Sequence, residues 1–214
     1  RGIVGGYPDG TFKPEKTVNR AELLKIVLAG NISEEELDKF ADEECFPDVP
    51  KGVWFTKYVC TAKSEGVVEG YPDGTFQPEK TVNFVEALKI MQIAYGIPFT
   101  ASSDIWFKKS VTDATEMNII PLDTMSFDQG FTRGQMAEML TRLIKYQEKE
   151  LDEYLGDKKD QVVTYEKIEV RQENLDFIPD FIPETDEDEQ LTCIYMTPMK
   201  LAPHVSHEES RRNI

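Results

Sequence analysis

Two arginines occupy the same place at the start of predicted helices. In residues 19–22 and 132–135 an Asn or Thr stands three residues before a Glu or Gln, which is the capping-box pattern of a helix N-terminus. Arg20 and Arg133 are then the first helical residues, beside backbone N–H groups that we expect to be unpaired. Such a helix end attracts anions, and a guanidinium can hold a carboxylate with two parallel hydrogen bonds. We interpret both arginines as candidate carboxylate-binding residues. The alternative is a surface arginine paired with a neighbouring carboxylate.

Residues typical of catalysis or metal binding are scarce. No histidine lies in residues 1–145, and no nucleophile and base form an apparent pair. Asp and Glu are too plentiful for any two of them to be singled out as a catalytic pair. His204, His207 and Cys193 lie near the end of the chain without a fourth zinc ligand. We expect no enzyme, no catalytic residue, no metal site and no cofactor.

The Asp-Gly pair at 73–74 suggests a calcium-binding EF-hand loop, but the register fails. With Gly74 at loop position 6, Tyr71 falls at position 3 and Lys80 at position 12, where a carboxylate is needed. A calcium site is therefore not predicted.

The three cysteines form neither a disulfide scaffold nor a metal ribbon. Cys45 and Cys60 are close enough in sequence to pair in an oxidising compartment. Buried free thiols are the favoured interpretation.

The elements that would position the arginines occur in repeats. Residues 6–12 and 70–76 are the same seven residues, Gly-Tyr-Pro-Asp-Gly-Thr-Phe, 64 positions apart, and residues 14–19 match 78–83. Pro, Asp and Gly in this order predict a tight turn. The turn is interpreted as scaffold first.

Helical patterns flank each turn. We expect helices over 20–30, 34–41, 54–65, 84–95 and 133 to about 155, from their caps and apolar spacing. A third, divergent copy aligns Trp106 with Trp54, but it lacks the Gly-Tyr-Pro-Asp-Gly turn sequence. The first copy lacks a leading helix, so the apolar face near Ile26 and Val27 is expected to lose its partner.

Composition excludes some functions. The net charge is −16, and residues 146–214 hold 8 Lys and Arg against 18 Asp and Glu, so nucleic-acid binding is not expected. No apolar run approaches the length of a membrane span. The chain opens without Met and within a motif, so we expect it to be a fragment.

The character of the chain changes after residue 156. Residues 161–170 alternate like a strand, and residues 173–190 are acidic with two prolines, which favours a disordered linker.

These residues resemble the S-layer homology family. Its repeat runs from a Phe-x-Asp and Trp segment, through Gly-Ile-Val-x-Gly-Tyr-x-Asp-Gly-Thr-Phe-x-Pro, to a Thr-Arg-Ala-Glu helix start. Residues 46–48, 54 and 66–78 follow this pattern, as do residues 2–14 and 18–22. The resemblance covers about residues 1–145.

The resemblance implies an all-α fold of tandem helix–loop–helix repeats in a pseudo-threefold bundle. We expect a truncated repeat over 1–30, a full repeat over 31–97, a divergent one over 98–156, and a strand-like segment with an acidic tail over 157–214. It also implies non-covalent anchoring at the extracellular cell wall or S-layer surface. The expected partner is a secondary cell-wall polysaccharide, often pyruvylated, or a peptidoglycan-linked glycan.

The implied glycan-binding residues lie in grooves between repeats. They are Arg20, Arg133, Asp9, Gly10, Asp73, Gly74, Trp54 and Trp106. The two tryptophans are candidates for stacking on sugars, although a Trp leading an amphipathic helix is more often core. Glu22, Glu86 and Gln135 are assigned to capping.

One departure limits the number of grooves. Phe84 replaces the arginine in the second repeat, so its groove should be weak or lost. The alternative function is a structural module for protein–protein assembly or self-assembly at the surface, with decayed glycan binding.

Overall fold

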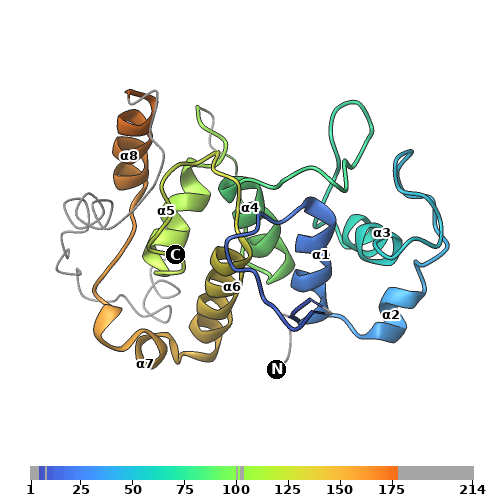
Figure 1. Ribbon diagram of the computed structural model, residues 1–214, viewed down its shortest axis with the longest axis horizontal. Helices are drawn as coiled ribbons and strands as arrows, with labels where there is room; N and C mark the ends of the chain where they lie inside the picture. Colours follow the sequence, from blue (N-terminus) through green and yellow to red (C-terminus); the bar gives the residue numbers. More distant parts are fainter. Residues whose placement is uncertain (1–4, 8, 100, 102–103, 178–214) are drawn as a thin grey trace, which may run out of the picture.

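The computed structural model describes residues 5–7, 9–99, 101 and 104–177, and this part of the chain is helical (Figure 1). Its elements are α1 (Arg20–Ala29), α2 (Glu34–Asp38), α3 (Thr56–Ser64), α4 (Phe84–Ala94), α5 (Lys108–Glu116), α6 (Arg133–Glu148), α7 (Leu151–Leu155), η1 (Gly156–Lys158) and α8 (Tyr165–Phe177). Within these ranges the only β-structure is a set of isolated bridges. The predicted all-α class is confirmed.

Three backbone hydrogen bonds form a closed ring at the centre of the molecule. The N–H of Val18 donates to Phe131 O at 2.8 Å, that of Phe131 to Val82 O at 2.9 Å, and that of Val82 to Val18 O at 3.0 Å. All three side chains are fully buried. Since each residue directly precedes a helix cap, α1, α4 and α6 begin around one point (Figure 1).

The caps of these helices follow the sequence closely. Asn19, Asn83 and Thr132 each accept a hydrogen bond from the backbone N–H three residues on, and a Glu or Gln side chain returns a bond to the cap N–H. The predicted capping boxes are therefore confirmed.

Several expected helix limits differ, and the short helix expected over 34–41 already ends at Asp38. α3 begins at Thr56 instead of residue 54. The last repeat helix does not run to about 155, because α6 ends at Glu148, Lys149 turns left-handed with φ of 61°, and α7 follows separately.

The first repeat does not lose the partner of its apolar face. Ile26 and Val27 are 7% and 0% exposed, and α1 packs against both α3 and α4. The expectation of an uncovered face was wrong, because helices from the following repeat cover it.

Cys45 and Cys60 form a disulfide, so the preference for free thiols was wrong. Their Cα atoms lie 5.4 Å apart, within the usual range for a bridge. The bond ties the segment before α3 to the buried face of that helix, where Cys60 is 2% exposed.

The expectation of a strand after residue 160 was also wrong. Tyr165–Phe177 is helix α8, which packs against α5. Tyr165, Ile168 and Arg171 are buried at three-residue spacing, so one helical face was mistaken for part of an alternating pattern. Most of the predicted linker, together with Cys193, His204 and His207, lies outside the described residues.

Every helix in the described part of the chain is too short or too polar to cross a lipid bilayer.

Candidate functional site

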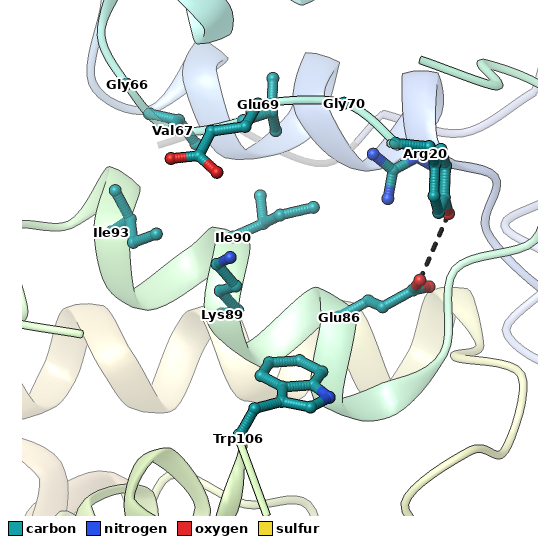
Figure 2. A pocket seen from close by; sticks show the side chains of 12 residues that line it. Arg20, Gly66, Val67, Glu69, Gly70, Glu86, Lys89, Ile90, Ile93 and Trp106 are labelled. Atoms are coloured by element: carbon teal, nitrogen blue, oxygen red, sulfur yellow. Dashed lines mark hydrogen bonds between the residues drawn. The ribbon is translucent and has the colours of Figure 1, made fainter. Parts of the chain in front are cut away.

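A pocket of about 220 Å³ lies between α4 and the segment 66–71. The α4 residues that line it are four on one helical face: Glu86, Lys89, Ile90 and Ile93. Arg20 at the start of α1 and Trp106 before α5 complete the wall, so segments far apart in the sequence meet there (Figure 2). We call this site the Arg20 pocket.

Arg20 holds the neighbouring turn loop in place. Its side chain is buried, and Nε donates to Phe76 O at 2.9 Å. The guanidinium carbon lies 4.7 Å from the ring centres of both Tyr71 and Phe76. Within the described residues Arg20 forms no ion pair, so the interpretation as a surface arginine paired with a carboxylate does not hold.

The helix start beside Arg20 is not an open anion site. The N–H of Arg20 donates to Lys80 O and that of Ala21 to Pro78 O, both at 3.0 Å, and the N–H of Glu22 is capped by Asn19. The expectation of unpaired N–H groups was wrong, because carbonyls of the next repeat occupy them. These three N–H groups of the α1 start are therefore not available to an anion.

The starts of α4 and α6 are closed in the same way. Phe84 N–H donates to Gln129 O, and Arg133 N–H donates to Lys16 O. The starts of α1, α4 and α6 are thus each closed by carbonyls from a distant segment of the chain.

Tyr71 joins the arginine to the acidic side of the pocket. Its hydroxyl donates to Glu86 Oε1 at 3.3 Å, which is the interaction drawn in Figure 2. Glu86 also accepts from the Asn83 N–H as part of the capping box. The predicted capping role of Glu86 is confirmed, and the carboxylate orients Tyr71 as well.

Lys89 places a second cation in the pocket. Its Nζ lies 4.9 Å from the Phe99 ring centre and 5.9 Å from that of Trp106. In the described chain this ammonium has aromatic neighbours but no ion pair or hydrogen bond. Figure 2 shows Lys89 between Glu69 and Trp106, so the pocket offers a charge that no carboxylate neutralises by contact.

Both tryptophans lie at the surface. Trp54 is 48% exposed and Trp106 is 39% exposed, so the interpretation as core residues was wrong. Each ring stands edge-on to the phenylalanine that follows it, Phe55 or Phe107, at 5.4 Å between centres. Phe55 is buried and Phe107 is partly buried, and both indoles remain accessible.

The contacts of the Arg20 pocket recur around Arg133. Its Nε donates to Phe12 O and its Nη2 to Gly5 O, both at 2.9 Å. Its guanidinium carbon lies 4.7 Å from the Tyr7 ring centre. On α1, Lys25 Nζ lies 5.6 Å from the ring centre of Trp54, as Lys89 faces Trp106. We call Arg133, Tyr7, Lys25 and Trp54 the Arg133 set.

The third equivalent position has different chemistry. Phe84 stands in place of arginine, is fully buried and packs on Phe131. On α6, Glu138 takes the place of lysine; it accepts from Tyr154 and forms an ion pair with Arg142, both at 2.7 Å. This position presents an internally paired carboxylate in place of a cation.

The turn residues shape exposed loops. Asp73 Oδ1 accepts from the N–H and hydroxyl of Thr75, and these hydrogen bonds lower the pKa of Asp73; Asp9 and Thr11 repeat the arrangement. Gly10 and Gly74 have φ of 78° and 82°. Neither Asp73 nor Gly74 lines the Arg20 pocket.

The structure therefore brings together Arg20 and Trp106 among the predicted residues. Sequence reasoning missed Lys89, Tyr71 and Glu69. The position of Lys89, five residues after the start of its helix, matches that of Lys25 and was the available signal.

Fold and site together define a helical module whose copies meet around cation–aromatic sites. The family model described as S-layer homology domain matches residues 1–24 and 46–88. These two regions are S-layer homology sequence, which confirms the resemblance. Residues 98–156 lie outside the matched ranges.

Several curated relatives share this part of the chain. The "Middle cell wall protein" of Brevibacillus brevis is 28% identical over 144 residues, which cover 67% of this chain and 14% of that protein. The "Cellulosome-anchoring protein" of Acetivibrio thermocellus is 34% identical over 95 residues, 42% of this chain and 20% of that protein. "Exoglucanase XynX" of the same species is 32% identical over 164 residues, 68% of this chain and 14% of that protein. The chain thus spans a small part of each relative.

Proposed function

We propose that this chain anchors a larger protein to the bacterial cell envelope by binding a cell-wall glycan without a covalent bond. The observation that carries the proposal is the Arg20 pocket, where a cation without a carboxylate partner lies beside an exposed tryptophan. Carbohydrate faces stack on exposed aromatic rings, and an ammonium group attracts a carboxylate.

The ligand chemistry that fits is an acidic sugar, such as a pyruvylated residue of a secondary cell-wall polysaccharide. The sugar ring stacks on Trp106, and the carboxylate contacts Lys89, whose Nζ lies 5.9 Å from the Trp106 ring centre. Arg20 contributes by holding Tyr71 and Phe76, which fixes the loop that forms the far wall. Because the chain is acidic overall, this local positive charge must provide the attraction.

The relatives support anchoring as the shared role. Proteins named as a cell wall protein, an anchoring protein and an exoglucanase have different tasks, yet each matches this chain over only a fifth or less of its length. A segment common to such different proteins fits attachment better than catalysis. We therefore propose no enzymatic activity for the described residues.

An extracellular location at the cell wall or S-layer surface fits the disulfide. Cys45 and Cys60 form a disulfide, and disulfides persist in oxidising compartments but are rare in the cytosol.

We further propose two binding positions. The Arg133 set repeats the arginine, tyrosine, lysine and tryptophan of the Arg20 pocket, whereas the third position lacks both cations. The three repeats would be arranged pseudo-threefold around the Val18, Val82 and Phe131 ring. Two sites on one chain would raise avidity for a polymeric glycan.

Sedimentation with purified sacculi tests the proposal. The full chain is mixed with intact walls and with walls stripped of secondary polymer by acid, and Trp106→Ala is compared with the unchanged protein. We expect binding to intact walls only, and a clear loss for Trp106→Ala with an unchanged melting temperature.

Other outcomes separate the competing functions. Equal binding to stripped walls would point to the peptidoglycan itself and exclude the secondary polymer. Binding to neither wall, together with concentration-dependent self-association, would favour the assembly module.

A further inference from the structure

Two of the three repeat contacts are closed by an arginine at the first position of a helix. Arg20 Nε donates to Phe76 O, and Arg133 Nε donates to Phe12 O, so each guanidinium fixes the turn loop of the neighbouring repeat. At the third contact the first residue of α4 is Phe84, whose side chain has no donor for the carbonyls of the loop 122–129; only its backbone N–H reaches that loop, at Gln129 O.

A different arginine reaches that loop. Arg171 on α8 is 2% exposed, and its Nη1 donates to the carbonyls of Leu122 and Thr124. Among the described residues Nη1 is the one hydrogen-bonded nitrogen of this guanidinium, and Nε and Nη2 are buried without a partner, so its hold on the loop rests on Nη1. The carbonyls of the third loop thus receive a guanidinium from a helix outside the repeats.

The same helix contacts the loop at two further points. Gln172 Oε1 accepts from the Phe127 N–H at 3.2 Å. The Tyr165 ring lies 4.8 Å from that of Phe127 and 6.4 Å from that of Phe107, between centres. α8 therefore holds the loop through its backbone and through an aromatic cluster.

The two residues that α8 contacts in this way, Phe127 and Phe107, also contact the walls of the Arg20 pocket. Phe127 O accepts from the N–H of Val85 in the first turn of α4, the helix that carries Lys89. Phe107 stands edge-on to Trp106 at 5.4 Å. The loop and the aromatic cluster thus lie directly between α8 and two pocket walls.

We propose that Arg171 is a positioning residue, through which α8 replaces the arginine missing from the start of α4 and holds that helix start and Trp106 in place. The module that forms the pocket therefore extends to α8, beyond the two regions of S-layer homology sequence. The inference concerns the site assigned under the proposed function, but it stands on protein contacts alone.

Hydrogen exchange of the full chain tests it without any ligand. Arg171→Met removes the donors and keeps much of the apolar volume, and Arg171→Lys keeps the charge. We expect the backbone amides of residues 84–85 and 122–129 to exchange on the order of tenfold faster in Arg171→Met. Arg171→Lys should show the same pattern at a smaller amplitude. Glu173→Gln, an exposed change on the same helix, is the control and should change nothing.

A spectroscopic readout reports on the pocket itself. In a Trp54→Phe background Trp106 is the only tryptophan, and Arg171→Met should increase its quenching by iodide. Unchanged exchange and quenching would overturn the proposal. Equally faster exchange in α3, far from α8, would also overturn it, because Arg171 would then support the whole fold. Wall binding does not enter these measurements, so they are independent of the anchoring test.

Discussion

Lys89 Nζ lies 5.9 Å from the centre of the Trp106 ring, and within the described residues neither side chain forms an ion pair or hydrogen bond with a carboxylate. Lys25 and Trp54 repeat this pair at 5.6 Å. At the third position Glu138 and Tyr154 form a hydrogen bond in its place. The equivalent position of α1, α4 and α6 is thus a lysine beside a tryptophan in two of the helices and a paired glutamate in the third.

Lys89→Gln should weaken binding to wall polysaccharide. The substitution removes the charge without a large change in volume, so the loss should be about tenfold in Kd for soluble polysaccharide released from walls. Titration calorimetry of the full chain measures it. Lys39→Gln at the C-cap of α2, an exposed lysine paired with Glu36, is the matched control and should bind as the unchanged protein does. Equal affinities for both variants would exclude a role of Lys89 in recognition.

Gly70→Ala should destabilise the fold more than Gly74→Ala. Both glycines have positive φ, 84° and 82°, but a Cβ at Gly70 would lie 2.6 Å from the Phe46 ring and 2.8 Å from Thr75 O. A Cβ at Gly74 meets no atom within 4 Å. We expect roughly 3 kcal/mol for Gly70→Ala and about 1 kcal/mol for Gly74→Ala from urea unfolding. Similar losses would show that the close contact at Gly70 relaxes freely.

Reduction of the Cys45–Cys60 bond should lower the melting temperature. The bond closes a loop with a sequence separation of 15, for which about 3 kcal/mol of stabilisation is typical. Thermal unfolding with and without reductant measures the shift. The double variant Cys45→Ala, Cys60→Ala should have a melting temperature close to that of the reduced protein, and reductant should not change it. A reductant effect that persists in the double variant would contradict this assignment.

Stability should fall at high pH because of Tyr154. Burial and the hydrogen bond to Glu138 raise the pKa of Tyr154 from 10.0 to about 12. Since the folded-state pKa lies above the unfolded value, this contribution is complete below pH 10.0 and is lost as the pH rises through about 12. Tyr154→Phe should therefore show a smaller fall in unfolding free energy between about pH 9 and about pH 11.5. An equal fall in unfolding free energy in Tyr154→Phe and in the unchanged protein would show that another group causes the loss of stability.

Much of the local structure was predictable because its causes are local. The caps at Asn19, Asn83 and Thr132 each depend on a residue three positions away, and all three form. Gly10 and Gly74, the last glycines of the two turn copies, have the positive φ that such turns require. The strand prediction near Tyr165 failed because a short alternating run cannot be distinguished from one buried helical face without knowing what covers it.

The sequence by itself determined the repeats, the helix starts and the equivalence of Arg20 with Arg133, because capping and turn chemistry act over a few residues. Only the tertiary structure decided that the helix N–H groups are occupied by neighbouring repeats, that Trp106 is exposed beside Lys89, and that α8 joins the module. These features depend on which distant segments meet around the central ring of backbone hydrogen bonds. The spacing of residues within one segment does not predict these contacts between distant segments.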